Sequence, residues 1–102
     1  MTFRVRFTRG AREDLERLYD FILERDPTDL ELAQRAIESI EAATRVLERF
    51  PFACRKAHMG TAFQRELLIP FGADGYVALF EVEDAHNVTI VAVRHQREDD
   101  YY

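Results

Sequence analysis

Several residue types and motifs are scarce in the 102-residue chain, and each shortage excludes a class of protein. Cys54 is the only cysteine, so neither an internal disulfide nor a cysteine-based zinc site can form. No apolar run approaches the roughly 20 residues of a membrane-spanning helix, and the first residues lack the apolar core of a signal peptide. We therefore expect a cytoplasmic protein with one domain, residues 1–102, and no membrane contact.

Motifs for cofactors and metals are also lacking. The three histidines show no metal-ligand spacing, and no HExxH or phosphate-loop motif occurs. The many acidic residues include no spacing that marks a catalytic pair. We expect no cofactor and no metal site.

Lysine is nearly missing, because Lys56 is the only one among 14 basic residues. The formal net charge is −5 and the pI is near 5.2. Neutralisation of phosphates dominates the binding of nucleic acid, so an acidic chain is poorly suited to it. Direct sequence-specific binding to nucleic acid is not expected, although residues 51–70 carry a local excess of basic residues.

The first half of the chain predicts one strand and two helices. Apolar residues alternate over residues 3–7, as in a half-buried strand. Helical spacing follows over residues 11–25 and again over residues 33–50. Thr28 starts a Thr-Asp-Leu-Glu capping box for the second helix, and Pro51 ends that helix. The short connection predicts an antiparallel helical hairpin.

The second half predicts three strands after an irregular connection at residues 51–61. They cover residues 63–69, 76–82 and 88 to 94 or 95, with a glycine-containing turn and a short polar loop between them. The order strand, helix, helix, strand, strand, strand predicts a two-layer α+β fold. A helical hairpin packs on one face of a small, mainly antiparallel sheet, and the other face is partly open.

Two short segments carry candidate chemistry. Arg65, next to Glu66 in the first strand after the helices, can pair with a carboxylate or bind a phosphate, or it is an ordinary sheet-surface arginine. His95 lies between Arg94 and Arg97 and can act as a general acid or base in RNA cleavage. The acidic residues that follow can equally neutralise these arginines, leaving a solvated, ion-paired C-terminus.

Several short segments together match a known pattern. They are Ala11, Asp14-Leu15, Leu47, Phe50-Pro51, Arg65-Glu66-Leu67, Gly75 to Val82 and Val91 to Arg97. With the order of elements, they resemble the RelE/ParE superfamily of toxins from type II toxin–antitoxin modules. The resemblance covers nearly the whole chain. It implies a growth-inhibiting toxin of a kind linked to plasmid stabilization.

The activity implied depends on which branch the chain resembles. RelE-like nucleases follow the equivalent of Gly75-Tyr76 with an arginine that contacts the scissile phosphate, whereas this chain has Val77. A tyrosine–arginine pair of the family is replaced by Phe80-Glu81. The resemblance is therefore ParE-like and implies a toxin that poisons DNA gyrase without chemistry of its own. A ribosome-dependent mRNA endonuclease of the RelE or YoeB kind, or a non-toxic antitoxin-binding protein, are the alternatives.

The resemblance also suggests residues for each role. The target-binding candidates, expected on the open sheet face and at the C-terminal end, are Arg65, Arg94, His95 and Arg97. For a nuclease, the catalytic candidates are His95, Arg65 and a terminal tyrosine, Tyr102 or Tyr101. The implied partner is a cognate antitoxin, ParD-like as a first guess, in a hetero-oligomeric complex. Candidates for its binding groove, off the main helical stripes, are Leu23, Leu30, Leu32 and Val46.

Overall fold

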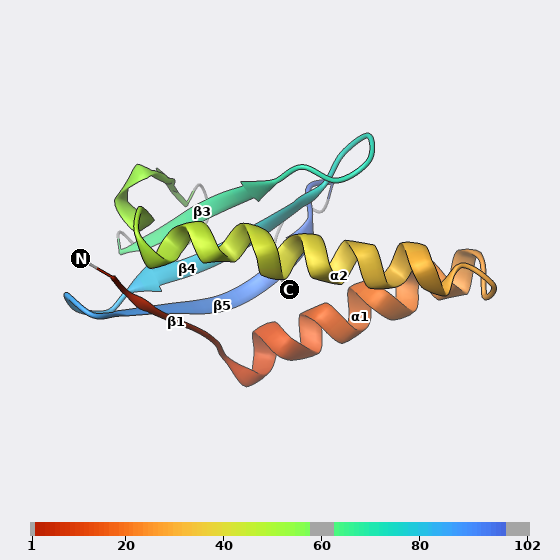
Figure 1. The fold of residues 1–102 in the computed structure, drawn as a ribbon, viewed down its shortest axis with the longest axis horizontal. Helices are drawn as coiled ribbons and strands as arrows, with labels where there is room; N and C mark the ends of the chain where they lie inside the picture. The colour runs from red at the N-terminus through yellow and green to blue at the C-terminus, as the bar shows by residue number, and fades with distance from the viewer. Residues whose placement is uncertain (1, 58–62, 98–102) are drawn as a thin grey trace.

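A computed structural model of the chain describes residues 2–57 and 63–97, which form two helices packed against one face of a sheet (Figure 1). The elements, in chain order, are β1 (Arg4–Phe7), α1 (Arg9–Arg25), α2 (Leu30–Thr44), the 3-10 turns η1 (Arg45–Glu48) and η2 (Pro51–Ala53), β2 (Arg55–Lys56), β3 (Gln64–Ile69), β4 (Tyr76–Val82) and β5 (Asn87–His95). The predicted α+β fold and element order are confirmed. No helix in these ranges is long and apolar enough to span a membrane.

The five strands form one mixed sheet in the order β1-β5-β4-β3-β2. Strand β1 runs parallel to β5, and all other neighbours are antiparallel. Strand β2 was not predicted. Its two residues, Arg55 and Lys56, are charged and exposed, so no alternation marks them, and they pair with Glu66 and Arg65 of β3.

The core lies between the helical hairpin and the sheet. Phe80 and Ile90 from the central strands meet Ile40 of α2 and Leu47 of η1, and all four side chains are fully buried. Burying each such side chain stabilises the fold by about 1.5–3 kcal/mol. The two helices lie side by side, as the predicted hairpin requires (Figure 1).

The helix ends differ in part from the sequence prediction. Thr8 caps α1, accepting a hydrogen bond from the Ala11 N–H at 3.1 Å. The cap of α2 is Asp29, which accepts from the Leu32 N–H at 3.1 Å, and not Thr28. The hydroxyl of Thr28 instead donates to Asp26 at 2.7 Å, so the predicted capping box is wrong.

The second helix is also shorter than predicted. Its α-helical part ends at Thr44, and a 3-10 turn continues to Glu48. This turn still directs Leu47 into the core, which explains why the apolar spacing continued beyond the α-helix. Pro51 begins η2, where its missing N–H leaves no donor unsatisfied.

A register irregularity in β5 connects the sheet to α1. Leu79 pairs with Ala92 and Phe80 with Ile90, which leaves Val91 as the extra residue of a bulge. Beyond it, the Val93 N–H donates to the buried carboxylate of Asp14 at 2.9 Å. This bond holds α1 against β5, and so brings the later turns of α1 beside the C-terminal end of β5.

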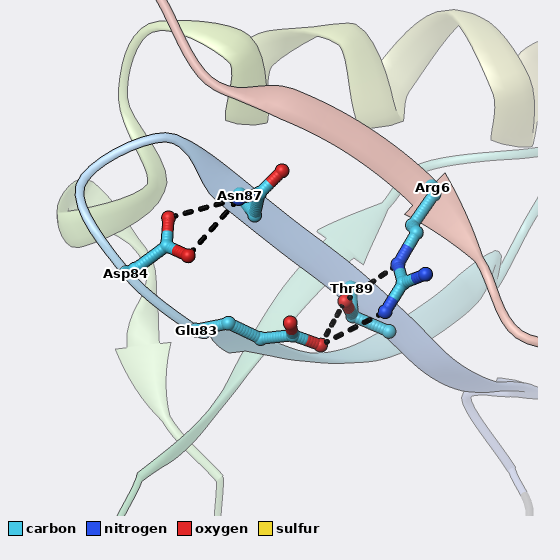
Figure 2. A network of polar contacts seen from close by, with 5 residues as sticks. All are labelled: Arg6, Glu83, Asp84, Asn87 and Thr89. Carbon is cyan, nitrogen blue, oxygen red and sulfur yellow. Dashed lines mark hydrogen bonds and ion pairs between the residues drawn. The ribbon is translucent and has the colours of Figure 1, made fainter.

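A polar network at the opposite end of β5 joins β1 to the β4–β5 hairpin (Figure 2). Arg6 donates to the Thr89 hydroxyl at 3.3 Å and pairs with Glu83 at 3.4 Å, while Thr89 also donates to Glu83. In the turn, the Asp84 carboxylate accepts two bonds from the Asn87 amide at 3.0 Å. The contacts of Arg6 join β1 to β5 and so support their parallel register.

Candidate functional site

Two aromatic rings mark the end of the sheet where β4 begins and β5 ends. Tyr76 and His95 are direct partners across the two strands. Their rings meet edge to face with centroids 5.7 Å apart. The tyrosine is almost fully buried, and this burial raises the pKa of its hydroxyl.

The turn before β4 holds this end of the sheet in place. Gly75 has a φ of 117°, a conformation that L side chains rarely adopt, and its carbonyl accepts from the Gln96 N–H at 3.0 Å. Arg97 forms an ion pair with Asp74 at 3.0 Å, and its N–H donates to Nδ1 of His95 at 3.1 Å. Asp74, His95 and Arg97 therefore form one connected group.

Helix α1 supplies the opposite wall. Arg17, Phe21 and Arg25 are spaced four residues apart, so they project from the same face of the helix. Together with the sheet end they line a cleft of about 360 Å³, which we call the α1 cleft; its described lining residues are Arg17, Leu18, Phe21, Ile22, Arg25, Asp74, Tyr76, His95 and Arg97. The cleft combines an apolar floor with three guanidinium groups and one carboxylate.

Two of the four predicted target-binding residues, His95 and Arg97, lie in this cleft, and Arg94 does not. Arg94 lies on the opposite face of the sheet with only 12% of its side chain exposed. Its guanidinium is 3.8 Å from Glu66, whose side chain is 1% exposed and which also pairs with Arg55 at 3.2 Å. These contacts give Arg94 a structural role.

The expectation that Arg65 lies on the open face is wrong. It shares its side of β3 with Ile69, which is buried in the core beneath the helices. Its guanidinium donates to the Cys54 carbonyl at 2.8 Å and stacks over the Phe52 ring at 5.4 Å from the centroid. Burial raises the pKa of the Cys54 thiol, and the positive charge of Arg65 partly opposes that rise.

Of the residues proposed for a nuclease, the two that the structure describes, Arg65 and His95, are not brought together. Arg65 pairs with Phe80 and His95 pairs with Tyr76, so the two lie four residues apart along β4. At the usual rise of a strand this separation is about 13 Å. Tyr101 and Tyr102 lie outside the described residues.

The predicted antitoxin-binding residues lie in two places. Leu23, Leu30 and Leu32 are near the turn between the helices, whereas Val46 is in η1, about 24 Å further along the helix axis. Leu30 and Val46 are 53% and 44% exposed, and the other two are half-buried. Val46 therefore belongs to a different surface from the other three.

Sequence reasoning missed the contribution of α1 to the site. The sequence does contain a pattern that could have indicated it. Arg17, Phe21 and Arg25 follow one another at helical spacing, on a side of α1 away from its buried apolar residues. Their proximity to Tyr76 and His95 depends on the packing of α1 against β5, which no local pattern specifies. Within the described ranges, no group of three metal-ligating side chains occurs.

The opposite face of the sheet carries a second, smaller apolar cluster. Val77, Leu79 and Ala92 are buried there, with Ala57 packed against them. Val77 is only 2% exposed. The position at which the resemblance places a phosphate-binding arginine thus holds a buried apolar side chain.

Comparisons with known proteins agree with this fold. A solved structure described as a chromosomal ParDE toxin–antitoxin system from P. aeruginosa aligns with a TM-score of 0.73 and 20% identity, covering 96% of this chain and 98% of that chain. The toxin–antitoxin complex RelBE2 from Mycobacterium tuberculosis aligns with a TM-score of 0.59 and 27% identity, covering 93% and 99%. No curated protein matches the sequence. The family model of the ParE toxin of the type II toxin–antitoxin system parDE matches residues 5–100, and the chain therefore belongs to this toxin family.

Proposed function

We propose that this ParE-family toxin inhibits bacterial growth by binding and poisoning DNA gyrase, and that it catalyses no reaction itself. The observation that carries the proposal is the burial of Val77, which is 2% exposed where the superfamily's nucleases present an arginine to the scissile phosphate. Because gyrase acts on the chromosome, the proposal places the toxin in the bacterial cytoplasm.

The other candidate cations support the same proposal. Cleavage of RNA without a metal needs positive groups aimed at the charge that develops on the phosphorus. Arg94 pairs with the buried Glu66, and Arg65 donates to a backbone carbonyl. His95 and Arg65 are offset by about 13 Å along the strand direction, and β4 lies between their strands. An mRNA endonuclease would thus have to use His95 without the guanidinium groups of Arg65 and Arg94 beside it.

We also propose that a cognate antitoxin, ParD-like as a first guess, binds this toxin in a hetero-oligomeric complex. Both solved structures reported above are described as toxin–antitoxin systems or complexes. The exposed apolar side chains of Leu30 and Val46 suit a partner that covers them. Coupled folding of a disordered antitoxin segment onto such a surface would neutralise the toxin.

A supercoiling assay with purified gyrase tests the target. We expect the wild-type toxin to inhibit supercoiling, and Arg97→Glu to raise the half-inhibitory concentration about tenfold, equivalent to about 1.4 kcal/mol of binding. Arg35→Glu, an exposed position on α2 outside the cleft, is the matched control and should change it less than about twofold.

A translating extract supplied with the same protein distinguishes gyrase poisoning from cleavage of mRNA. Intact mRNA alongside inhibited gyrase supports the proposal. Ribosome-dependent cleavage of mRNA, with gyrase unaffected, would establish the nuclease instead.

A further inference from the structure

We propose that the cognate antitoxin binds this toxin through a segment that carries both carboxylates and apolar side chains, and that this segment docks where η1, η2 and the start of β3 meet. The proposal rests on the proposed function in taking an antitoxin as the partner. It adds the place of contact and the chemistry recognised there. We call this surface the phenylalanine patch, and its exposed apolar residues are Val46, Phe50, Phe52 and Phe63.

The patch gathers most of the exposed apolar side chains of the molecule. Of the seven large apolar side chains exposed in the described part of the chain, four belong to it, and they are Val46, Phe50, Phe52 and Phe63, at 44%, 59%, 63% and 81% exposure. The elements that carry them lie together at the end of the molecule where the chain begins (Figure 1). An exposed apolar group of this kind marks a surface that a partner covers.

Contacts within the patch hold it together. The Phe50 N–H donates to the Val46 carbonyl at 2.9 Å, which keeps both residues in one turn. The ring of Phe52 meets the buried ring of Phe3 edge to face, with centroids 6.2 Å apart. The guanidinium of Arg65 lies over the same Phe52 ring, 5.4 Å from its centroid, and so joins η2 to β3. A partner would therefore meet a surface that is already formed.

The charge of this end of the molecule is opposite to that of the chain. Residues 45–65 hold five of the 14 basic residues but only one of the 19 acidic residues, in a chain of net charge −5. That acidic residue is Glu48, and Glu41 lies four residues before Arg45 on α2. The cations outnumber these two carboxylates.

Three of the cations have no carboxylate partner in the part of the chain that the structure describes. Arg45, Arg49 and Lys56 are exposed, and no ion pair there involves them. Lys56 also lies directly opposite Arg65 across β2 and β3, and like charges in this arrangement repel each other. A carboxylate from a partner would relieve this repulsion and pair with the exposed arginines.

The carboxylates of the neighbouring strands do not neutralise these cations. Glu66 lies on the opposite face of the sheet from Arg65, because successive residues of a strand alternate between faces. The carboxylates near this end of the sheet also have partners of their own; Glu66, Glu81, Glu83 and Asp84 contact Arg55, Gln64, Arg6 and Asn87 respectively. An acidic segment is therefore the electrostatic complement of the patch.

The apolar side chains favour a protein segment over a nucleic acid. Val46 offers no aromatic face to a base, and Arg65 already covers one face of the Phe52 ring. Phosphates that continue beyond the patch would meet a chain of net charge −5. A protein segment can instead place a few carboxylates beside the cations and apolar side chains on the rings.

Affinity measurements on purified proteins test the charge. Arg45→Glu/Arg49→Glu changes the patch, and Arg9→Glu/Arg35→Glu changes the net charge equally at exposed positions of α1 and α2. The Kd of each toxin for the purified cognate antitoxin is measured at low and at high salt. We expect the Kd at low salt to rise at least about tenfold for the patch variant and less than about threefold for the control. Added salt should weaken binding of the wild type more than binding of the patch variant, because salt screens the ion pairs that the variant lacks.

Neutralisation in growing bacteria tests the apolar contact. Phe50→Ala removes an exposed ring of the patch, and Leu68→Ala removes a side chain of 46% exposure on the other face of β3. Each toxin is induced together with the antitoxin under a second inducer, and the antitoxin level that restores growth is measured. We expect this level to rise at least about fivefold for Phe50→Ala and less than about twofold for the control. The Kd for the antitoxin is measured for both variants as well.

A folding control accompanies both pairs. Thermal unfolding of each purified protein verifies that it is folded, and Arg45→Gln/Arg49→Gln replaces the charge reversal if that variant unfolds.

The outcomes separate this proposal from the proposed function. Weaker binding and weaker neutralisation of the folded patch variants than of their controls support it, whatever the target of the toxin is. If the wild type binds the antitoxin and the patch variants bind it as tightly as their controls, the phenylalanine patch is overturned while the proposed antitoxin partner stands. If the wild type does not bind the antitoxin, both are overturned. Patch variants that lose affinity for a single-stranded oligonucleotide but keep their affinity for the antitoxin would assign the patch to a nucleic acid instead.

Discussion

The arginines of this protein have different roles, according to what each one contacts. Arg94 neutralises a buried carboxylate, Arg65 bonds to a backbone carbonyl, and Arg97 lines an open cleft. Strand alternation predicts which face a residue occupies. It does not reveal the partner of a side chain, such as the buried Glu66 that pairs with Arg94 or the Cys54 carbonyl that accepts from Arg65.

Removal of the Glu66 carboxylate should be strongly destabilising. Glu66→Ala leaves the guanidinium of Arg94, 12% exposed, without the carboxylate it pairs with, so the free energy of unfolding should fall by about 3 kcal/mol in a urea titration. Glu13→Ala breaks an exposed pair with Arg9 and should change it by less than about 1 kcal/mol. Equal effects of the two substitutions would contradict the structural role of Glu66.

The turn at Asp84 should make stability depend on pH. Hydrogen bonds from the Asn87 side chain and the His86 N–H lower the pKa of this carboxyl from its ordinary 3.8. Because the pKa of Asp84 is lower in the folded protein than in the unfolded chain, ionisation of this carboxyl stabilises the fold at a pH above the unfolded pKa. This stabilisation is lost as the pH falls through the folded pKa. The Tm difference between wild type and Asp84→Asn should therefore be largest near neutral pH and shrink below about pH 4. A constant difference would contradict this assignment.

The helices and strands that were predicted best are those in which a regular spacing of apolar residues continues over many positions. The stripes of α1 and α2 and the apolar runs of β4 and β5 are of this kind, and all four elements are present. The errors lie where local contacts compete. The hydroxyl of Thr28 donates to Asp26 and so does not cap α2. The 3-10 turn after Thr44 places apolar residues at nearly the spacing of an α-helix. The two residues of β2 are too few to show a pattern.

The start of α2 can be tested by a pair of neighbouring substitutions. Asp29→Ala removes the side-chain acceptor for the Leu32 N–H and should lower the free energy of unfolding by about 1 kcal/mol. Thr28→Ala removes only a contact to Asp26 and should have a smaller effect. If Thr28→Ala lowers the free energy of unfolding more than Asp29→Ala in a urea titration, the result would support the capping box predicted from the sequence.

Two glycines in the turn between β3 and β4 offer a matched comparison. Gly72 has a φ of 61° with open space around it, so Gly72→Ala should cost about 1–2 kcal/mol. Gly75 combines a φ of 117° with close approach to the Ile69 carbonyl, and Gly75→Ala should cost more, roughly 3 kcal/mol. The order of the two unfolding midpoints checks this. Loss of the Gly75 conformation should also displace His95, because Gln96 is bonded to the Gly75 carbonyl.

At the scale of the whole molecule, the two-layer fold followed from the element order, but the site did not. The α1 cleft joins residues 17–25 to residues 74–97. These segments are held together by the apolar packing of α1 on β5 and by the bond from the Val93 N–H, beyond the bulge in β5, to Asp14. Neither the bulge nor this bond has a local signature in the sequence. Long-range packing therefore decides which charged residues share a surface.

Incorporation of labelled precursors after induction of the toxin alone tests the central claim most directly. DNA synthesis and protein synthesis are followed together in the same culture. Gyrase poisoning predicts that DNA synthesis falls first, with a DNA-damage response, while protein synthesis continues. An earlier fall in protein synthesis would contradict it, and His95 would then become the first residue to test for catalysis.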